Sequence, residues 1–263
     1  MIKFFRNIRK KLLEQGKTAN YLKYAIGEIV LVVIGILIAL QINTWNQERL
    51  VKQEIKTNLI NLSSAIKQDL ELLKEIEAYN EFRSNSILQI LKWTEIPFRE
   101  IDTIPIKLKS ALIWQGEIPE TFNAEFFEKS FGLIGAPRRM VVQTYAIEEL
   151  KNSGLYSKLD NQELKSILNL YYSQLKWFFG QDEFSENKTV DEIRNYIIIN
   201  YNLDERDIPF IANPLETIKK DPGLLVRLRE VRYNAGWRLY GAQTSINRAE
   251  LLLKEIQKEI DKI

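Results

Sequence analysis

The sequence of 263 residues predicts an all-α fold: one N-terminal transmembrane helix, then an extracytoplasmic helical bundle whose long N- and C-terminal helices run antiparallel. The first observation is an unbroken apolar run from Ile29 to Leu40, which suits the centre of a membrane-spanning helix. The second is the three-and-four spacing of apolar residues in 47–93 and 222–263, typical of amphipathic helices. The third is the scarcity of strand signals, since the β-branched run Ile197–Ile199 lies within a helical pattern.

Charge is distributed unevenly along the chain. Residues 1–23 hold seven basic residues and one acidic residue, whereas the remainder holds 30 basic and 34 acidic residues. Positive charge next to a transmembrane segment stays in the cytoplasm, so residues 1–23 are predicted to form a basic cytoplasmic tail. Its topology-determining residues are Lys3, Arg6, Arg9, Lys10 and Lys11. A basic head on a mildly acidic body argues against nucleic acid as a partner.

Residues 24–43 are predicted to be the transmembrane anchor. From Tyr24 to Ile42 a helix would extend about 28 Å, close to the thickness of a bilayer core. Tyr24 and Trp45 flank the apolar run, as interfacial aromatic residues do. A buried helix of a soluble protein and a cleaved signal peptide are the alternatives, but no Ala-x-Ala pattern follows the run. We favour an uncleaved signal anchor, with residues 44–263 as the extracytoplasmic helical domain.

Three anchor residues are candidates for specific contacts. Glu28 either has a function within the membrane or snorkels from one turn inside the cytoplasmic boundary. Gly35 and Ala39 form a small-xxx-small pair, which either lets two helices approach closely or faces lipid.

The N-terminal motif resembles that of an uncharacterised bacterial family. The motif comprises Met1–Arg6 and the run YAIGEIVLVVIGILIALQINTWN at 24–46, with a thinner likeness through Tyr145–Gly154 and the C-terminal helix. Members of that family are small single-pass membrane proteins classed as a domain of unknown function. The resemblance implies a bacterial inner (cytoplasmic) membrane location, a short basic tail and a helical body, but no activity. Glu28 matches the family pattern, whereas Thr44 stands where the family usually has Asn.

The two long helices of the body have apolar seams. Residues 47–93 contain no Gly or Pro, so the membrane helix is expected to continue into this one, with a bend at Asn43–Asn46. Its seam is Ile55, Leu59, Leu62, Ile66, Leu73 and Ile76, with Asp69 as a break. The C-terminal helix is expected to begin with Asp221 as N-cap and Pro222 at its first position. Its heptad seam is Leu239, Ala242, Ile246, Ala249, Leu253, Ile256, Ile260 and Ile263.

The seams pair with each other as an antiparallel core, or one of them forms a dimeric coiled coil. Gly223, Gly236 and Gly241 would permit a bend in the C-terminal helix. The shorter helices predicted between the seams are Ile104–Gln115, Pro137–Asn152, one opened by Asp160–Glu163 and ending near Phe179, and one opened by Thr189–Glu192 and ending near Tyr201.

Composition excludes several kinds of chemistry. The chain has no cysteine and no histidine, which removes thiolate and histidine catalysis and the usual zinc sites. There is no glycine-rich phosphate loop and no Asp-x-Asp metal loop. No cofactor and no metal site are therefore predicted, and enzymatic activity is not favoured.

Three groups of residues are weighed as chemical sites. The carboxylate pairs Glu125/Glu128 and Glu148/Glu149 would suit a glycoside hydrolase if a cleft brought them together. Basic residues would suit an anion site or an ordinary charged surface: Arg138, Arg139, Arg227, Arg229 and Arg232. Aromatic residues would line a pocket or, as we favour, fill the core: Phe122, Phe126, Phe127, Phe131, Tyr171, Tyr172, Trp177, Phe178 and Phe179.

These observations favour a non-enzymatic membrane-anchored interaction or scaffold module. The expected partners are the lipid bilayer and either a membrane protein or a second copy of the chain. The alternative is an extracytoplasmic bundle that senses a ligand and acts through a separate partner. A carboxylate-based hydrolase is the least favoured function.

Overall fold

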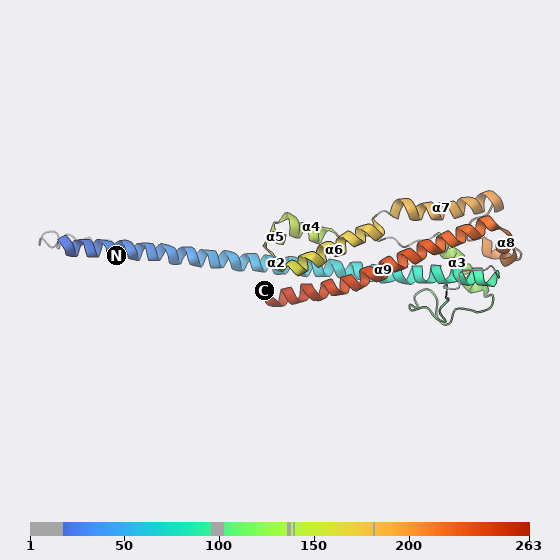
Figure 1. Cartoon of the computed structure of the whole chain (residues 1–263), viewed down its shortest axis with the longest axis horizontal. Coiled ribbons are helices and arrows are strands. Elements are labelled where there is room, and N and C mark those ends of the chain that lie inside the picture. The colour runs from blue at the N-terminus through green and yellow to red at the C-terminus, as the bar shows by residue number, and fades with distance from the viewer. Residues whose placement is uncertain (1–17, 96–102, 136–137, 139, 181) are drawn as a thin grey trace. The chain divides into compact units, whose positions relative to one another are not determined.

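The computed structural model describes residues 18–95, 103–135, 138, 140–180 and 182–263, and all regular structure within them is helical (Figure 1). An isolated bridge between Lys107 and Glu117 is the one β-type pairing among these residues. The all-α prediction is confirmed. The chain divides into two compact units, residues 1–57 and residues 58–263.

Helix α2 spans Thr18–Trp93. It contains both the apolar run of the predicted anchor and the predicted helix 47–93, and residues 43–46 are helical. All six predicted seam residues of 47–93 are buried, at 5% exposure or less. The three-and-four spacing therefore identified the buried face of this helix correctly.

The remaining helices belong to residues 58–263. They are α3 (Ala124–Ile134), α4 (Tyr145–Asn152), α5 (Leu155–Lys158), α6 (Gln162–Phe179), α7 (Asp182–Tyr201), the 3₁₀ helix η1 (Ile208–Phe210), α8 (Pro214–Lys220) and α9 (Pro222–Lys262). Helices α6 and α7 follow one another along α9 and both pack against it (Figure 1).

The C-terminal helix begins as predicted. The Asp221 carboxylate accepts hydrogen bonds from the backbone N–H groups of Gly223 (2.9 Å) and Leu224 (3.1 Å), so it is the N-cap of α9. Tyr196 and Tyr201 of α7 donate their hydroxyls to the same carboxylate. The Asp221 side chain therefore caps the start of α9 and links this helix to α7 through hydrogen bonds.

Gly223 and Gly241 of α9 allow close packing, and α9 remains helical through both of them and through Gly236. A Cβ atom at Gly241 would lie 2.9 Å from the Phe178 ring, and one at Gly223 would lie 2.2 Å from the Tyr196 hydroxyl. Both glycines therefore let another helix approach the α9 backbone.

The predicted helix Ile104–Gln115 is wrong. These residues form turns and extended backbone, and the N–H groups of Lys109 (2.8 Å) and Ser110 (3.2 Å) donate to the buried Glu81 carboxylate. A single helix of that length is marginal in water, and here tertiary contacts take its backbone donors. Four of its apolar side chains still pack around Phe82 and Phe126: Ile104, Leu108, Ile113 and Trp114. Ile106 and Leu112 are exposed.

Three other helix starts differ from the prediction. Helix α4 begins at Tyr145 because the N–H of Gln143 donates to Asp69 (3.1 Å). Helix α6 is capped by Asn161 in place of Asp160, and its end at Phe179 is as predicted. Helix α7 begins at Asp182, before the expected start at Thr189, and ends at Tyr201 as predicted.

The core at one end of residues 58–263 joins six elements. It includes Ile90 of α2, Phe131 of α3, Ile197 of α7, Ile218 of α8 and Leu228 of α9, together with Ile208 of η1. The C-terminal heptad seam is only partly buried: Ala242, Ala249, Ile256 and Ile260 are buried, whereas Leu239, Ile246, Leu253 and Ile263 are partly exposed.

Candidate functional site

The apolar part of α2 presents its side chains outward. Among the described residues, α2 is long and apolar enough to cross a membrane, and none of its most apolar stretch is buried. Exposed aliphatic side chains continue from Ile29 to Ile42, and Trp45 is 64% exposed. Exposing such a surface to water is unfavourable, so the structure gives this helix a surface suited to lipid.

The predicted anchor residues whose side chains the structure describes lie on this helix. A Cβ atom at Gly35 would meet nothing within 4 Å, and Ala39 is exposed. Glu28 is partly exposed, and the side chain of Tyr24 lies outside the described part. The topology residues Lys3, Arg6, Arg9, Lys10 and Lys11 also lie outside it.

The predicted carboxylate pairs do not converge. Glu125 and Glu128 of α3 line a pocket of ≈ 410 Å³ with Arg206 and Phe210, whereas Glu148 lines a separate pocket. Arg206 is already bonded to Asp204 (2.7 Å), and this contact lowers the pKa of Asp204 to about 2. The structure thus brings Glu125 and Glu128 to one surface but does not join the two pairs in one cleft.

The candidate anion-binding arginines contact protein groups. Arg138 lies 4.7 Å from the Tyr79 ring centroid and 4.0 Å from Glu75, and Arg227 lies 4.1 Å from the Tyr196 ring centroid. Arg229 and Arg232 also have partners, and Arg139 lies outside the described residues. Arg138 is not at a helix start, because α4 begins at Tyr145. These contacts favour the interpretation as ordinary surface charge.

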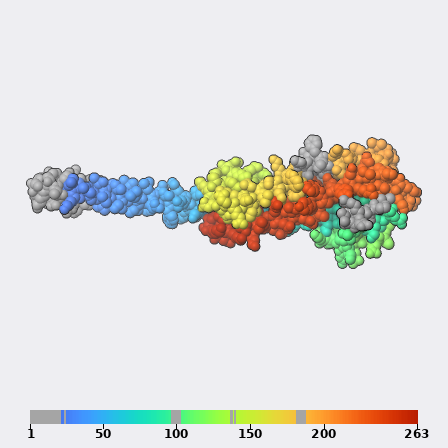
Figure 2. Space-filling view, in the orientation of Figure 1, coloured from blue at the N-terminus to red at the C-terminus, as the bar shows by residue number. Residues whose placement is uncertain are grey.

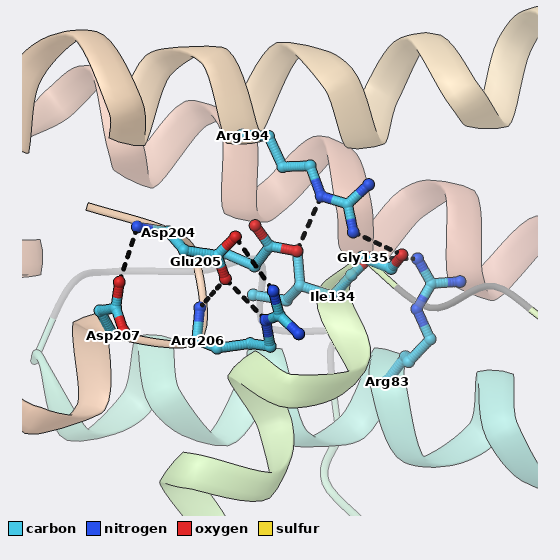
Figure 3. Close-up of polar contacts among 8 residues, drawn as sticks. All are labelled: Arg83, Ile134, Gly135, Arg194, Asp204, Glu205, Arg206 and Asp207. Atoms are coloured by element: carbon cyan, nitrogen blue, oxygen red, sulfur yellow. Dashed lines mark hydrogen bonds and ion pairs between the residues drawn. The ribbon is translucent and has the colours of Figure 1, made fainter. Parts of the chain in front are cut away.

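A second arginine cluster closes the C-terminal end of α3 (Figure 3). Arg194 of α7 donates to Glu205 (2.7 Å) and to the carbonyl of Gly135 (2.9 Å), and Arg83 of α2 donates to the carbonyl of Ile134 (3.1 Å). The last carbonyls of a helix lack intrahelical donors. The two arginines therefore provide hydrogen-bond donors for the carbonyls at the end of α3 and link this helix to α2 and α7. Their role is structural.

Most of the predicted aromatic set fills the core, as favoured. Phe126, Phe127, Phe131, Tyr171, Phe178 and Phe179 are buried. Trp177 and Phe122 are exceptions, at 59% and 46% exposure, and Tyr172 is partly exposed.

Trp177 belongs to an exposed aromatic surface that the sequence analysis missed. Its ring centroid lies 5.3 Å from that of Trp237, and Trp237 lies 6.0 Å from Tyr240. Trp237 is 48% and Tyr240 56% exposed. We call Trp177, Trp237 and Tyr240 the aromatic surface. It lies on α6 and α9, whose surfaces adjoin in Figure 2.

A larger pocket of ≈ 570 Å³ lies between α4 and α6. Val142, Ile147 and Tyr172 contribute apolar lining, and Glu148, Lys151 and Lys176 contribute charge. The sequence pointed only to Glu148 and Tyr172 among these residues, because nothing local indicates that α4 and α6 lie side by side.

The wall of this pocket is fixed by the buried Asp69. Its carboxylate accepts hydrogen bonds from the Gln143 N–H (3.1 Å) and the Tyr171 hydroxyl (3.1 Å). Tyr172 in turn donates to the carbonyl of Gln143 (3.4 Å). Burial raises the pKa values of Tyr171 and Tyr172, and the Asp69 charge adds to both shifts. Both tyrosines therefore remain protonated donors at neutral pH.

Comparison with known proteins identifies a similarity but no activity. Residues 28–106 are similar to a family described as "Family of unknown function (DUF6090)". The expected likeness to a family without a known function is confirmed, but the matched residues do not include Met1–Arg6, Tyr145–Gly154 or the C-terminal helix. The comparisons with curated proteins and with solved structures gave no match.

Proposed function

We propose that this chain is a non-enzymatic interaction module anchored in the bacterial inner membrane by residues 24–43. Residues 1–23 lie in the cytoplasm and residues 44–263 outside it. The exposed apolar side chains of α2 support the anchor, and the basic residues before it support the orientation.

We further propose that the long helices of the extracytoplasmic domain run antiparallel. The support comes from one end of the core, where Leu91 near the end of α2 shares a cluster with Leu224 near the start of α9. Lys219, just before α9, also pairs with Glu95, just after α2 (2.8 Å).

The aromatic surface is the observation that carries the interaction role. Trp and Tyr are enriched where protein interfaces gain most of their binding energy. The two tryptophans remain about half exposed, although α6 buries three other aromatic rings, Tyr171, Phe178 and Phe179. The proposed partner is a membrane protein with an extracytoplasmic apolar patch that covers Trp177 and Trp237.

The test is co-purification from the native membrane after in-cell crosslinking. The full-length chain is compared with a Trp177→Ala/Trp237→Ala variant and with Tyr145→Ala, which removes an equally exposed ring from α4. We expect a stoichiometric partner to be retained by Tyr145→Ala and reduced at least about tenfold by the double variant, because interface centres of this type contribute about 2 kcal/mol or more per residue.

Two results would refute the proposal at different points. A partner that binds the double variant normally and requires residues 1–46 would place the interface in the anchor. Recovery of the chain with neither a partner nor a second copy would remove the interaction role altogether. Matching circular dichroism melting curves of the variants would exclude misfolding as the cause of a loss.

A further inference from the structure

The pocket between α4 and α6 has the size and lining of a small-molecule site. Its volume of ≈ 570 Å³ falls within the usual range for ligand pockets, about 300–1,000 Å³. The apolar contribution comes from Val142 before α4, Ile147 on α4 and Tyr172 on α6. None of these residues belongs to the aromatic surface, so this inference goes beyond the proposed function and does not depend on it.

The pocket wall is held in place by hydrogen bonds that centre on a buried carboxylate. Asp69 is 1% exposed, and it accepts from the backbone of Gln143 and from Tyr171. Tyr172, which lines the pocket, donates to Gln143 from the next position on α6. Because the wall is already ordered, little conformational entropy is lost when a ligand binds to it.

The charged residues that line the pocket form no ion pairs with the residues that the structure describes. Glu148, Lys151 and Lys176 are exposed, and within the described residues none of their side chains makes an ion pair. Lys151 does lie 5.5 Å from the Tyr156 ring centroid. Glu148 and Lys151 are one turn apart on α4, and Lys176 lines the same pocket from α6. One carboxylate and two ammonium groups therefore line the same pocket as the apolar residues.

We infer that this pocket binds a small zwitterion with apolar side chains, of the class of a short apolar peptide. The ligand carboxylate would meet Lys176 and Lys151, its ammonium group would meet Glu148, and its apolar side chains would lie against Ile147 and Tyr172. Charge-assisted hydrogen bonds at both charged ends of the ligand would fix its orientation in the site. A fatty acid matches the lysines and the apolar wall, but it leaves Glu148 next to a ligand of the same charge.

The test is calorimetric titration of the full-length chain in lipid nanodiscs with Leu-Leu. N-acetyl-Leu-Leu removes the ammonium group of the ligand, and Leu-Leu amide removes its carboxylate. We expect Leu-Leu to bind at least about tenfold more tightly than either derivative, as the loss of one hydrogen bond to a charged group predicts. Bound Leu-Leu should also raise the melting temperature.

Single substitutions test which protein residue binds each charged group of the ligand. Glu148→Gln should weaken Leu-Leu about tenfold and leave N-acetyl-Leu-Leu unchanged, whereas Lys176→Gln should weaken Leu-Leu and leave the amide unchanged. Glu149→Gln is the matched control, because Glu149 is the exposed neighbour of Glu148 and is not among the pocket residues.

Three outcomes would overturn the inference. One is no heat and no stabilisation by Leu-Leu at millimolar concentration. Another is an equal effect of Glu148→Gln and Glu149→Gln. The third is equal or tighter binding of N-acetyl-Leu-Leu, which would make the pocket a site for anionic amphiphiles.

Discussion

Asp69 interrupts the apolar seam of α2 and is nevertheless buried. A buried carboxylate is unfavourable unless it is hydrogen-bonded, and here the Gln143 N–H and the Tyr171 hydroxyl bind its two oxygens. The sequence identified Asp69 as a break in the pattern, but its partners lie 74 and 102 residues away. No local signal could have found them.

The environment of Asp69 predicts a pH dependence. Burial raises its pKa above the usual 3.8, against the lowering effect of the hydrogen bonds from Gln143 and Tyr171. The folded chain therefore binds this proton more tightly than the unfolded chain. The favourable contribution is complete below pH 3.8 and is lost as the pH rises through the folded pKa.

We expect Asp69→Asn to keep the free energy of unfolding at neutral pH within about 1 kcal/mol of the unaltered chain, or to raise it. Asn retains an oxygen for the Gln143 N–H and offers an N–H to Tyr171, but carries no charge. Relative to this variant, the unaltered chain should lose stability as the pH rises from about 3.5 to about 7. Urea unfolding across this range measures the difference.

Comparison with Asp69→Ala separates the contribution of the hydrogen bonds to stability from that of the carboxylate charge. It leaves the Gln143 N–H and the Tyr171 hydroxyl without their acceptor, which should cost about 2–3 kcal/mol. If Asp69→Asn were as destabilising as Asp69→Ala, the carboxylate charge itself would be required, and the assignment above would be wrong.

At the scale of elements, helix ends with strong local signals were predictable. Asp221-Pro222 identified the start of α9, and the end of α6 at Phe179 was also correct. The helix predicted at Ile104–Gln115 failed because its backbone donors bind Glu81, far away in the sequence. The α9 seam was only half right, because its alternate buried positions are Arg238, Ser245 and Leu252, one residue before the predicted Leu239, Ile246 and Leu253. Two of these three buried residues are polar, so a search for apolar residues could not select them.

The glycines of α9 give a paired prediction. In an open helical position Gly→Ala stabilises by about 0.5–1 kcal/mol, and at Gly236 the nearest atom to an added Cβ is the Ser84 hydroxyl at 3.9 Å. At Gly241 the same methyl group would lie 2.9 Å from the Phe178 ring. We expect Gly236→Ala to raise the free energy of unfolding and Gly241→Ala to lower it by about 1–3 kcal/mol through overpacking.

Chemical denaturation of the two variants under identical conditions provides the measurement. Each variant controls for the other, because both substitutions change helix propensity by the same amount. Stabilisation of both variants would show that α6 does not approach α9 as closely as described.

At the scale of the whole molecule, the sequence predicted that an apolar helix precedes a helical body. The pocket between α4 and α6 and the aromatic surface could not be predicted, because each depends on which helices become neighbours. Tyr233, Trp237 and Tyr240 did offer a partial signal: their spacing along α9 places large aromatic residues on one helix face. Their exposure follows only from the packing.

The final prediction concerns where the stability of the molecule resides. The described side chains of residues 25–46 are exposed or only partly buried, whereas the core begins further along α2, with Leu59 and Leu62 completely buried. A chain of residues 47–263 should therefore fold without detergent and melt within a few degrees of the full-length chain. The reason is that removing exposed residues sacrifices no buried contacts.

Truncation to residues 66–263 is the matched comparison. It removes Leu59, Leu62 and Ala65, which are all completely buried, and each lost leucine should cost about 2–5 kcal/mol. Circular dichroism melts should then rank the shorter chain far below residues 47–263. Aggregation or early melting of residues 47–263 would instead mean that the apolar part of α2 stabilises the body, and that it is more than an anchor.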